Sequence, residues 1–178
     1  MTHPDRPISE SYWILPGKFL AGEYAGHWDE AQTHSKLTAF LNAGFDTFID
    51  LTTPGELIPY QPILEEEARD YDREIQYHRF PIPDKGVPSR ETMTAILDTI
   101  DAAIAAGRKA YIHCLGGVGR TGTTVGCYLV RHGHSGAEAL RQLAEWWQNV
   151  PKHLYHPCSP ETEQQVDFIR EWDENKAI

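Results

Sequence analysis

Cysteines, long hydrophobic runs and basic residues are all scarce in this sequence. Three cysteines among 178 residues form a small and odd set, which argues against a disulfide framework. No apolar run reaches the roughly 18–20 residues that span a bilayer, and the first residues lack the basic and apolar regions of a signal peptide. We therefore expect a soluble cytoplasmic protein, in which a cysteine can work as a thiolate.

The shortage of basic residues gives the chain a formal net charge of −10, from 16 Lys and Arg against 26 Asp and Glu. An acidic surface repels nucleic-acid phosphates and anionic lipids, so we expect no nucleic-acid partner and no membrane partner. A hydrophobic content of 40% indicates a folded protein. Without repeats or low-complexity segments, the sequence predicts one domain over residues 1–178, a monomer whose residues 1–10 form a flexible lead-in.

Hydrophobic periodicity and turn residues predict strands that alternate with helices. A hairpin is expected over residues 12–25, with its turn at Pro16-Gly17. The expected strands that follow cover residues 45–51, 75–82 and 110–114, and the expected helices cover residues 29–43, 62–72, 89–107, 121–131, 135–149 and 160–172. This alternation predicts an α/β fold with a central mixed, partly parallel sheet flanked by helices.

The most informative segment follows the last expected strand and reads His113-Cys114-Leu-Gly-Gly-Val-Gly-Arg120-Thr121. A loop that wraps a phosphate must aim several backbone N–H groups inward, and glycines permit the backbone angles and the close approach that this requires. The helix after the loop adds the positive end of its dipole. The predicted phosphate-binding residues are Leu115, Gly116, Gly117, Val118, Gly119 and Arg120.

The same surroundings prepare a nucleophile. Positive charge from Arg120 and from the helix end favours the thiolate form of Cys114. The planar guanidinium of Arg120 can hold two phosphoryl oxygens at once, which a lysine cannot do. Since this positive charge is already present, we expect no metal and no cofactor. The histidine pairs 132/134 and 153/156 have no companion ligands at a convincing spacing.

The segment His-Cys-x5-Arg-Thr resembles the signature of the cysteine-dependent protein tyrosine phosphatases, in their dual-specificity-like branch. Weaker similarities support it by their order and spacing: Phe19-Leu-Ala-Gly-Glu-Tyr-Ala, Phe48-Ile-Asp-Leu-Thr52, Pro81-Ile-Pro-Asp84 and Ser159-Pro-Glu-Thr. The resemblance covers roughly residues 12–172. It implies a protein tyrosine phosphatase-like fold and hydrolysis of phosphomonoesters through a phosphocysteine, on phosphorylated proteins or small phosphomonoesters.

Asp84 is the predicted proton donor to the leaving oxygen. The resemblance implies a donor aspartate on a mobile loop before the cysteine, and Asp84 lies in a stretch rich in proline and glycine, 30 residues before Cys114. Asp50, at the end of an expected strand, is the next candidate. We expect Thr121 to donate its hydroxyl to the Cys114 sulfur, and His113 to order the loop and tune the thiolate.

Several alternatives remain open. The substrate could be a small molecule such as a nucleotide or an inositol phosphate, and a rhodanese-like sulfur carrier or an arsenate reductase also uses a cysteine in an anion-binding loop. A binding module without turnover is a further alternative, which the loss of Cys114, Arg120 or Asp84 would favour. Tyr60, Arg79 and Lys85 are expected to contact the substrate, and Gln165 is expected to be structural. Cys127 is expected in the core and Cys158 without a role in catalysis. Either cysteine could trap Cys114 in a disulfide.

Overall fold

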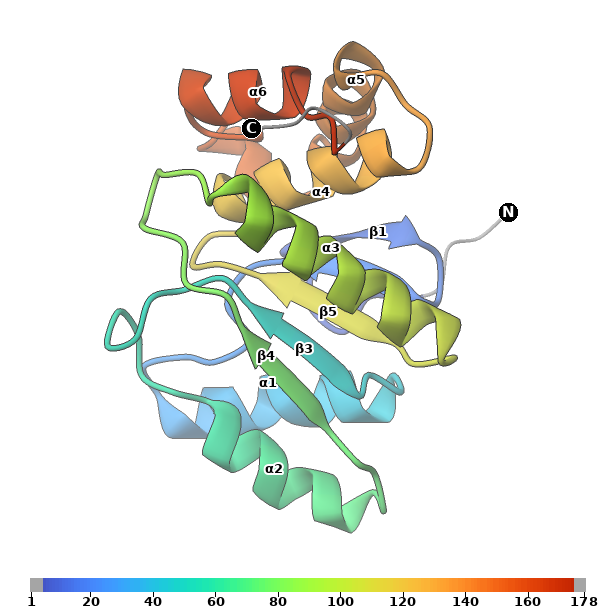
Figure 1. Ribbon diagram of the computed structural model, residues 1–178. Coiled ribbons are helices and arrows are strands. Elements are labelled where there is room, and N and C mark those ends of the chain that lie inside the picture. Colours follow the sequence, from blue (N-terminus) through green and yellow to red (C-terminus); the bar gives the residue numbers. More distant parts are fainter. Residues whose placement is uncertain (1–4, 175–178) are drawn as a thin grey trace.

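A five-stranded sheet forms the middle layer of the structure, a computed structural model that describes residues 5–174 (Figure 1). The strands are β1 (Ser11–Leu15), β2 (Phe19–Gly22), β3 (Thr47–Asp50), β4 (Gln76–Arg79) and β5 (Ala110–His113). Their order across the sheet is β1-β2-β5-β3-β4, in which β1 and β2 are antiparallel and all other neighbours are parallel. The predicted mixed, partly parallel sheet is confirmed.

Helices cover both faces of this sheet. They are α1 (Glu30–Asn42), α2 (Gln61–Asp70), α3 (Arg90–Ala105), α4 (Arg120–Arg131), α5 (Gly136–Trp147) and α6 (Glu163–Arg170), with a short 3-10 helix η1 (Pro151–Leu154). Figure 1 shows α1 and α2 on one side of the sheet and α3 to α6 on the other. As predicted, Asp29 caps α1 and Ser89 caps α3, each by accepting a hydrogen bond from a first-turn amide.

The alternation of side chains along the strands builds two hydrophobic cores. Leu20, Phe48 and Tyr111 pair in register on β2, β3 and β5 and belong to the core beneath α1 and α2. Their chain neighbours Ile49 and Ile112 point to the opposite face and join the core beneath α3 and α4. Burial on both faces explains why these strands read as nearly continuous apolar runs.

Some elements are shorter than the sequence predicts. The β4 segment ends at Arg79 because Pro81 has no N–H to donate, although Phe80 and Ile82 still donate hydrogen bonds to Asp50 and Leu51. Likewise, α6 begins at Glu163, after the Thr162 side chain caps it. These shortened ends leave irregular backbone beside the carboxyl edge of the sheet.

The expected lead-in lies against the rest of the chain where the structure describes it. Arg6 donates to the Asn149 carbonyl over 3.3 Å, and the Glu10 carboxylate accepts from the Lys152 amide over 3.1 Å. Residues 1–4 fall outside the described part. Within residues 5–174, no helix has the length and apolar character needed to cross a membrane.

Helix α4 occupies the centre of the second core, and its position fixes the loop that precedes it. A side chain at Gly126 would overlap Ile169, so glycine lets α4 and α6 approach closely. The Ser159 hydroxyl donates to the Val118 carbonyl over 2.7 Å. Both contacts hold the start of α4 at the carboxyl end of β5, where ligands bind in folds of this class.

Candidate active site

A cavity of about 250 Å³, which we call the phosphate cavity, lies where β5 ends and α4 begins. It is lined by Asp84, Cys114, Leu115, Gly116, Val118, Gly119, Arg120, Lys152, His156 and Glu161. The structure therefore brings Cys114, Arg120 and Asp84 to one wall, as the sequence analysis expected. Three separate segments supply the lining: the loop after β4, the loop after β5 and the segment between α5 and α6.

The loop after β5 keeps its shape by packing tightly on β2. Gly117 has a φ of +74°, and a Cβ there would lie 2.5 Å from the carbonyl carbon of Gly22. The Leu115 carbonyl accepts a hydrogen bond from the Tyr24 amide over 2.9 Å. Gly117 is the one predicted phosphate-binding residue that does not line the cavity, and its described role is this close approach.

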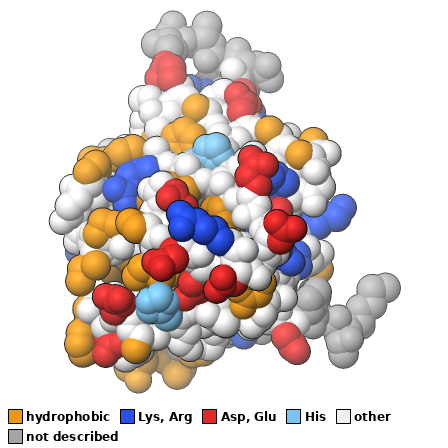
Figure 2. Space-filling model, turned by 90° about the horizontal axis from the view of Figure 1, so that it is seen from below, with side chains coloured by type: hydrophobic (Ala, Val, Ile, Leu, Met, Phe, Trp, Pro, Cys, Tyr) orange, Lys and Arg blue, Asp and Glu red, His pale blue; other side chains and the backbone are white. Residues whose placement is uncertain are grey.

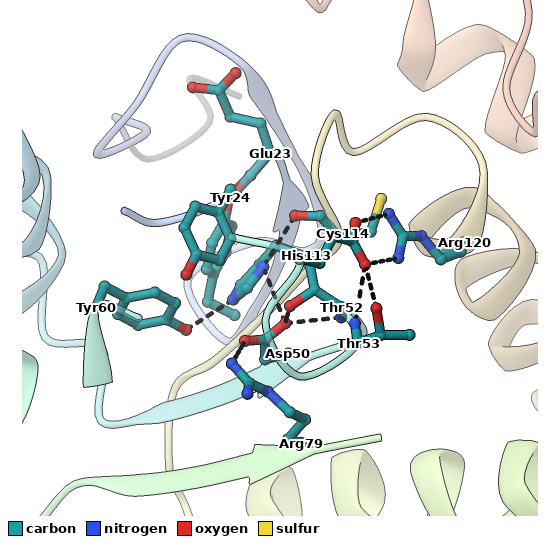
Figure 3. A network of polar contacts seen from close by, with 12 residues as sticks. Glu23, Tyr24, Asp50, Thr52, Thr53, Tyr60, Arg79, His113, Cys114 and Arg120 are labelled. Atoms are coloured by element: carbon teal, nitrogen blue, oxygen red, sulfur yellow. Dashed lines mark hydrogen bonds and ion pairs between the residues drawn. The ribbon is translucent and has the colours of Figure 1, made fainter. Parts of the chain in front are cut away.

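The sulfur of Cys114 and the guanidinium of Arg120 lie on the same side of the β5 end (Figure 3). Cys114 is only 3% exposed, and both residues line the phosphate cavity. Burial by itself would lower the pKa of Arg120, but Glu56 and Cys114 hold it above its ordinary value. The arginine is thus a permanent cation beside the nucleophilic sulfur.

Glu56 holds the Arg120 guanidinium in a two-point ion pair. Arg120 Nη1 donates to Glu56 Oε2 over 2.9 Å and to the Ile82 carbonyl over 3.0 Å, while Nη2 donates to Glu56 Oε1 over 2.7 Å. Nη2 also donates to Asp84 Oδ1 over 3.2 Å. Within the described part of the chain, Nε of Arg120 has no hydrogen-bond partner. Its N–H lies next to the Nη2 N–H that donates to Asp84. A phosphoryl group can use both by displacing Asp84.

The Glu56 carboxylate is ionised and partly shielded from water, which suits its ion pair with Arg120. The hydrogen bond from Arg120, helped by the Thr53 amide, lowers the pKa of Glu56 to about 2. Its side chain is 17% exposed, so the pair is partly shielded from water. Sequence analysis did not find Glu56, because 64 positions separate it from Arg120 and no spacing rule connects them.

His113 supports the backbone of the nucleophile, as predicted. Its Nδ1 lies 3.1 Å from the Cys114 carbonyl, which can only accept, so Nδ1 carries the proton. Nε2 then accepts from the Tyr60 hydroxyl over 2.7 Å. Burial lowers the pKa of His113, which keeps the ring neutral. One hydrogen bond donated and one accepted by the fully buried ring therefore fix the residue that precedes the loop.

Asp50 and Tyr60 are buried, Arg79 is half-buried, and none of the three lines the phosphate cavity. Asp50 is fully buried and accepts from Thr52, from the Tyr77 hydroxyl over 2.5 Å and from Arg79 over 2.9 Å. Burial alone would raise the pKa of Asp50, but the electrostatic interaction with His113 and the hydrogen bonds from Thr52 and Tyr77 lower it. Asp50 as an alternative proton donor is wrong, since it lies outside the cavity and stays ionised. Tyr60 and Arg79 do not line the phosphate cavity, and their expected role as substrate contacts stays a prediction.

Thr121 lies in the first turn of α4 and is fully buried. Its hydroxyl has no hydrogen-bond partner within residues 5–174, so the expected bond to the Cys114 sulfur is absent here. The sulfur is instead enclosed by the loop and by Arg120. The expectation for Thr121 is corrected on this point.

The segment between α5 and α6 adds wall residues that the sequence analysis missed. Lys152 Nζ donates to the Gly116 carbonyl over 3.2 Å and to Glu23 Oε2 over 2.8 Å, which ties this segment to the loop. Gln165 is structural, as expected: its side chain donates to the Gly86 carbonyl over 3.0 Å. Lys85 reaches Glu161 at 3.9 Å and does not line the cavity.

The three cysteines are free, and they differ in their surroundings. Cys127 is buried in α4, and burial raises the pKa of its thiol. Cys158 is exposed. Within residues 5–174, no group of three or more His, Cys, Asp or Glu side chains is arranged to hold a metal ion.

Comparison with known proteins gives a consistent result. A family model described as "Polymorphic toxin system, DSP-PTPase phosphatase" matches residues 24–134. An uncharacterized protein of Methanocaldococcus jannaschii is 31% identical over 106 residues, which cover 60% of this chain and 65% of that protein. The mouse dual specificity protein phosphatase CDC14B is 30% identical over 135 residues, which cover 67% of this chain and 24% of CDC14B.

Solved structures agree with these sequence matches. The crystal structure of Tk-PTP in the active form is 26% identical, with a TM-score of 0.68, and the match covers 94% of this chain and 98% of that one. The chain spans less than two thirds of the curated relatives that it first matches, 65% and 60% of the two M. jannaschii proteins. The matched region contains both the loop after β5 and the segment that carries Glu56.

Proposed function

Because the chain belongs to the DSP-PTPase phosphatases, within the superfamily of cysteine-dependent protein tyrosine phosphatases, we propose that it hydrolyses phosphomonoesters of tyrosine and also of serine or threonine in proteins. One observation carries this proposal: Cys114, Arg120 and Asp84 line the same small cavity. A nucleophile, a two-point anion holder and a proton donor are the three groups that phosphoryl transfer to sulfur requires.

In the first step the Cys114 thiolate attacks phosphorus in line with the leaving oxygen. Arg120 and the loop amides hold the three other phosphoryl oxygens, where negative charge gathers in the transition state. The incoming phosphate displaces Asp84 from Arg120, and Asp84, in its protonated form, gives its proton to the departing oxygen. The sulfur–phosphorus bond forms, the phosphorus–oxygen bond breaks, and the alcohol or phenol leaves.

In the second step water hydrolyses the phosphocysteine. Asp84 is now a carboxylate and accepts a proton from the water that attacks phosphorus. The sulfur leaves as a thiolate, which the positive charge of Arg120 stabilises. Inorganic phosphate is released and the starting state is restored, so the reaction consumes one water for each phosphomonoester.

Glu56 and His113 position the reacting groups. Glu56 sets the angle at which Arg120 presents Nε and Nη2, and it takes no part in the bonds that form and break. His113 fixes the Cys114 carbonyl and thereby the direction of the Cα–Cβ bond that carries the sulfur. Both residues act through another residue, so we regard them as positioning residues.

Hydrolysis of p-nitrophenyl phosphate and of tyrosine-, serine- and threonine-phosphorylated peptides tests the proposal. We expect turnover in the presence of a chelator and inhibition by vanadate, because the site holds the phosphoryl group with Arg120 and amides alone. Nucleotides and inositol phosphates form the comparison set in the same assay. If these were hydrolysed and every phosphopeptide left intact, the assignment to protein substrates would be wrong.

A further inference from the structure

A second and larger cavity, of about 660 Å³, lies beside the phosphate cavity, and we call it the apolar groove. It is lined by Glu23, Tyr24, Gly26, His27, Trp28, Lys36, Gly55, Glu56, Leu57, Ile58, Pro59 and Leu115. These residues come from the segment between β2 and α1, from α1, from the loop between β3 and α2, and from the loop after β5. Its volume is in the range of sites that hold a small ligand or several side chains.

The two cavities adjoin each other. Leu115 lines both of them. Glu23 of the groove accepts a hydrogen bond from Lys152 of the phosphate cavity over 2.8 Å, and Glu56 of the groove binds Arg120. A molecule whose phosphoryl group lies against Arg120 can therefore extend past Leu115 into the groove.

The groove exposes apolar surface that the fold does not use. Trp28 is 78% exposed, Ile58 is 60% exposed and Leu115 is 48% exposed. Figure 2 shows hydrophobic side chains gathered along the left margin, the side on which the loops after β2 and β3 lie in Figure 1. Contiguous exposed apolar surface beside a cavity is typical of a binding site.

The charged groups of the groove are already paired within the protein. Lys36 donates to Glu23 over 3.0 Å and to the Tyr24 carbonyl over 2.6 Å. Glu23 also binds Lys152, and Glu56 binds Arg120. The groove thus offers contact area and no free charge, which selects for an apolar occupant.

We propose that the apolar groove binds an aromatic or branched aliphatic side chain that neighbours the phosphorylated residue of a protein substrate. This rests on the proposed function and adds the substrate class that the same site prefers. A peptide fits better than a phosphoinositide, because the lysine in the groove is already bound and the net charge of −10 repels anionic lipid surfaces. Acidic side chains are also spread over the face in Figure 2.

The experiment compares phosphotyrosine peptides that differ only in the side chains within two residues of the phosphotyrosine, which are Leu or Phe in one set and Ala in the other. Binding is measured calorimetrically with the Cys114→Ser protein, and kcat/KM is measured with otherwise wild-type protein. Trp28→Ala and Ile58→Ala remove apolar surface from the groove. Tyr155→Ala and Leu154→Ala are matched controls, being 84% and 73% exposed and absent from both cavities.

We expect the apolar-flanked peptides to bind and react about tenfold better than the alanine-flanked set, the effect of one well-buried side chain. Trp28→Ala and Ile58→Ala should abolish most of this preference and leave p-nitrophenyl phosphate hydrolysis unchanged, whereas both controls should keep the preference. A ratio near one for the two peptide sets would overturn the proposal.

The binding measurement separates this inference from the proposed function. If the wild-type protein hydrolysed nothing, the proposed function would fail, yet binding to Cys114→Ser would still show whether the groove selects apolar neighbours. Vesicles that contain a phosphoinositide form a further arm. If Trp28→Ala weakened vesicle binding or lipid hydrolysis and left the peptide preference intact, the groove would be a lipid site and the proposal would be wrong.

Discussion

The phosphate cavity and the apolar groove share Leu115 and are built in opposite ways. The phosphate cavity takes most of its lining from one stretch, residues 114–120, and its Cys114 and Arg120 side chains are buried. The groove takes its lining from separate segments, and its key side chains are apolar and exposed. In the proposed function, chemistry is thus concentrated in one loop, while recognition is spread over the surface around it.

The two regions also differ in what fixes them. Arg120 is held by Glu56, Ile82 and Asp84, and His113 is held by Tyr60 and by the Cys114 carbonyl. Trp28 and Ile58 of the groove are largely exposed. A preorganised pocket suits a reaction whose transition state is always the same, whereas a pliable apolar rim suits substrates that vary.

The largest expected effect comes from the nucleophile. Cys114→Ser should lower kcat for p-nitrophenyl phosphate by on the order of 10⁴-fold or more, because a serine hydroxyl is not ionised at neutral pH. Cys158→Ser, at an exposed cysteine, is the control and should keep full activity. Equal rates for the wild-type and Cys114→Ser proteins would show that Cys114 is not the nucleophile and that the phosphate cavity is not the site of the reaction.

Next in size is the effect of Arg120→Lys. Lysine keeps the charge and loses the fork that binds Glu56 and phosphate together, so kcat/KM should fall by about 10²–10³-fold. Steady-state kinetics with vanadate as competitor measure both turnover and anion binding. An unchanged vanadate affinity would show that the loop amides hold the oxyanion without Arg120.

Asp84→Asn should separate substrates by their leaving groups. Phenyl phosphate should slow by on the order of 10²-fold and p-nitrophenyl phosphate by about tenfold, because a good leaving group needs less protonation. Equal losses on both substrates would show that Asp84 is not the donor.

The smallest expected effect concerns Glu56, which lines the groove and supports the phosphate cavity. The pKa of Glu56 is lowered from 4.5 to about 2, so its ion pair stabilises the folded state above pH 4.5, and this contribution is lost as the pH falls toward 2. The difference in unfolding free energy between the wild-type protein and Glu56→Gln should therefore shrink over that interval, as measured by urea unfolding. Glu66→Gln, at an exposed position of α2, is the control and should show no such trend.

Local signals predicted most of the fold. The turn at Pro16-Gly17 and the caps Asp29 and Ser89 act within a few residues, so their chemistry is visible in the sequence. The predicted ends of β4 and α6 were too long, because Pro81 and the Thr162 cap determine where pairing and helix begin or end. The residue at which a helix or strand ends depends on single hydrogen bonds, whereas the presence of the helix or strand depends on many hydrogen bonds and contacts.

The residues of the candidate site likewise include some that are visible in the sequence and some that only the fold brings together. Cys114, Arg120 and the loop between them are contiguous, and Asp84 was found because a proton donor on a loop before the cysteine is implied by the resemblance. Asp50 was misjudged as a donor, since only the fold shows that Tyr77 and Arg79 enclose it. Contacts between distant residues leave no periodic pattern to read.

The sequence by itself determined the order of strands and helices and the glycine-rich loop between Cys114 and Arg120, because these properties depend on neighbours along the chain. Only the tertiary structure decided that Glu56 forms an ion pair with Arg120, that Tyr60 forms a hydrogen bond with His113, and that an apolar groove lies beside the phosphate cavity. Burial, ion pairing and surface shape arise where distant segments meet, and those meetings are settled by packing the whole chain.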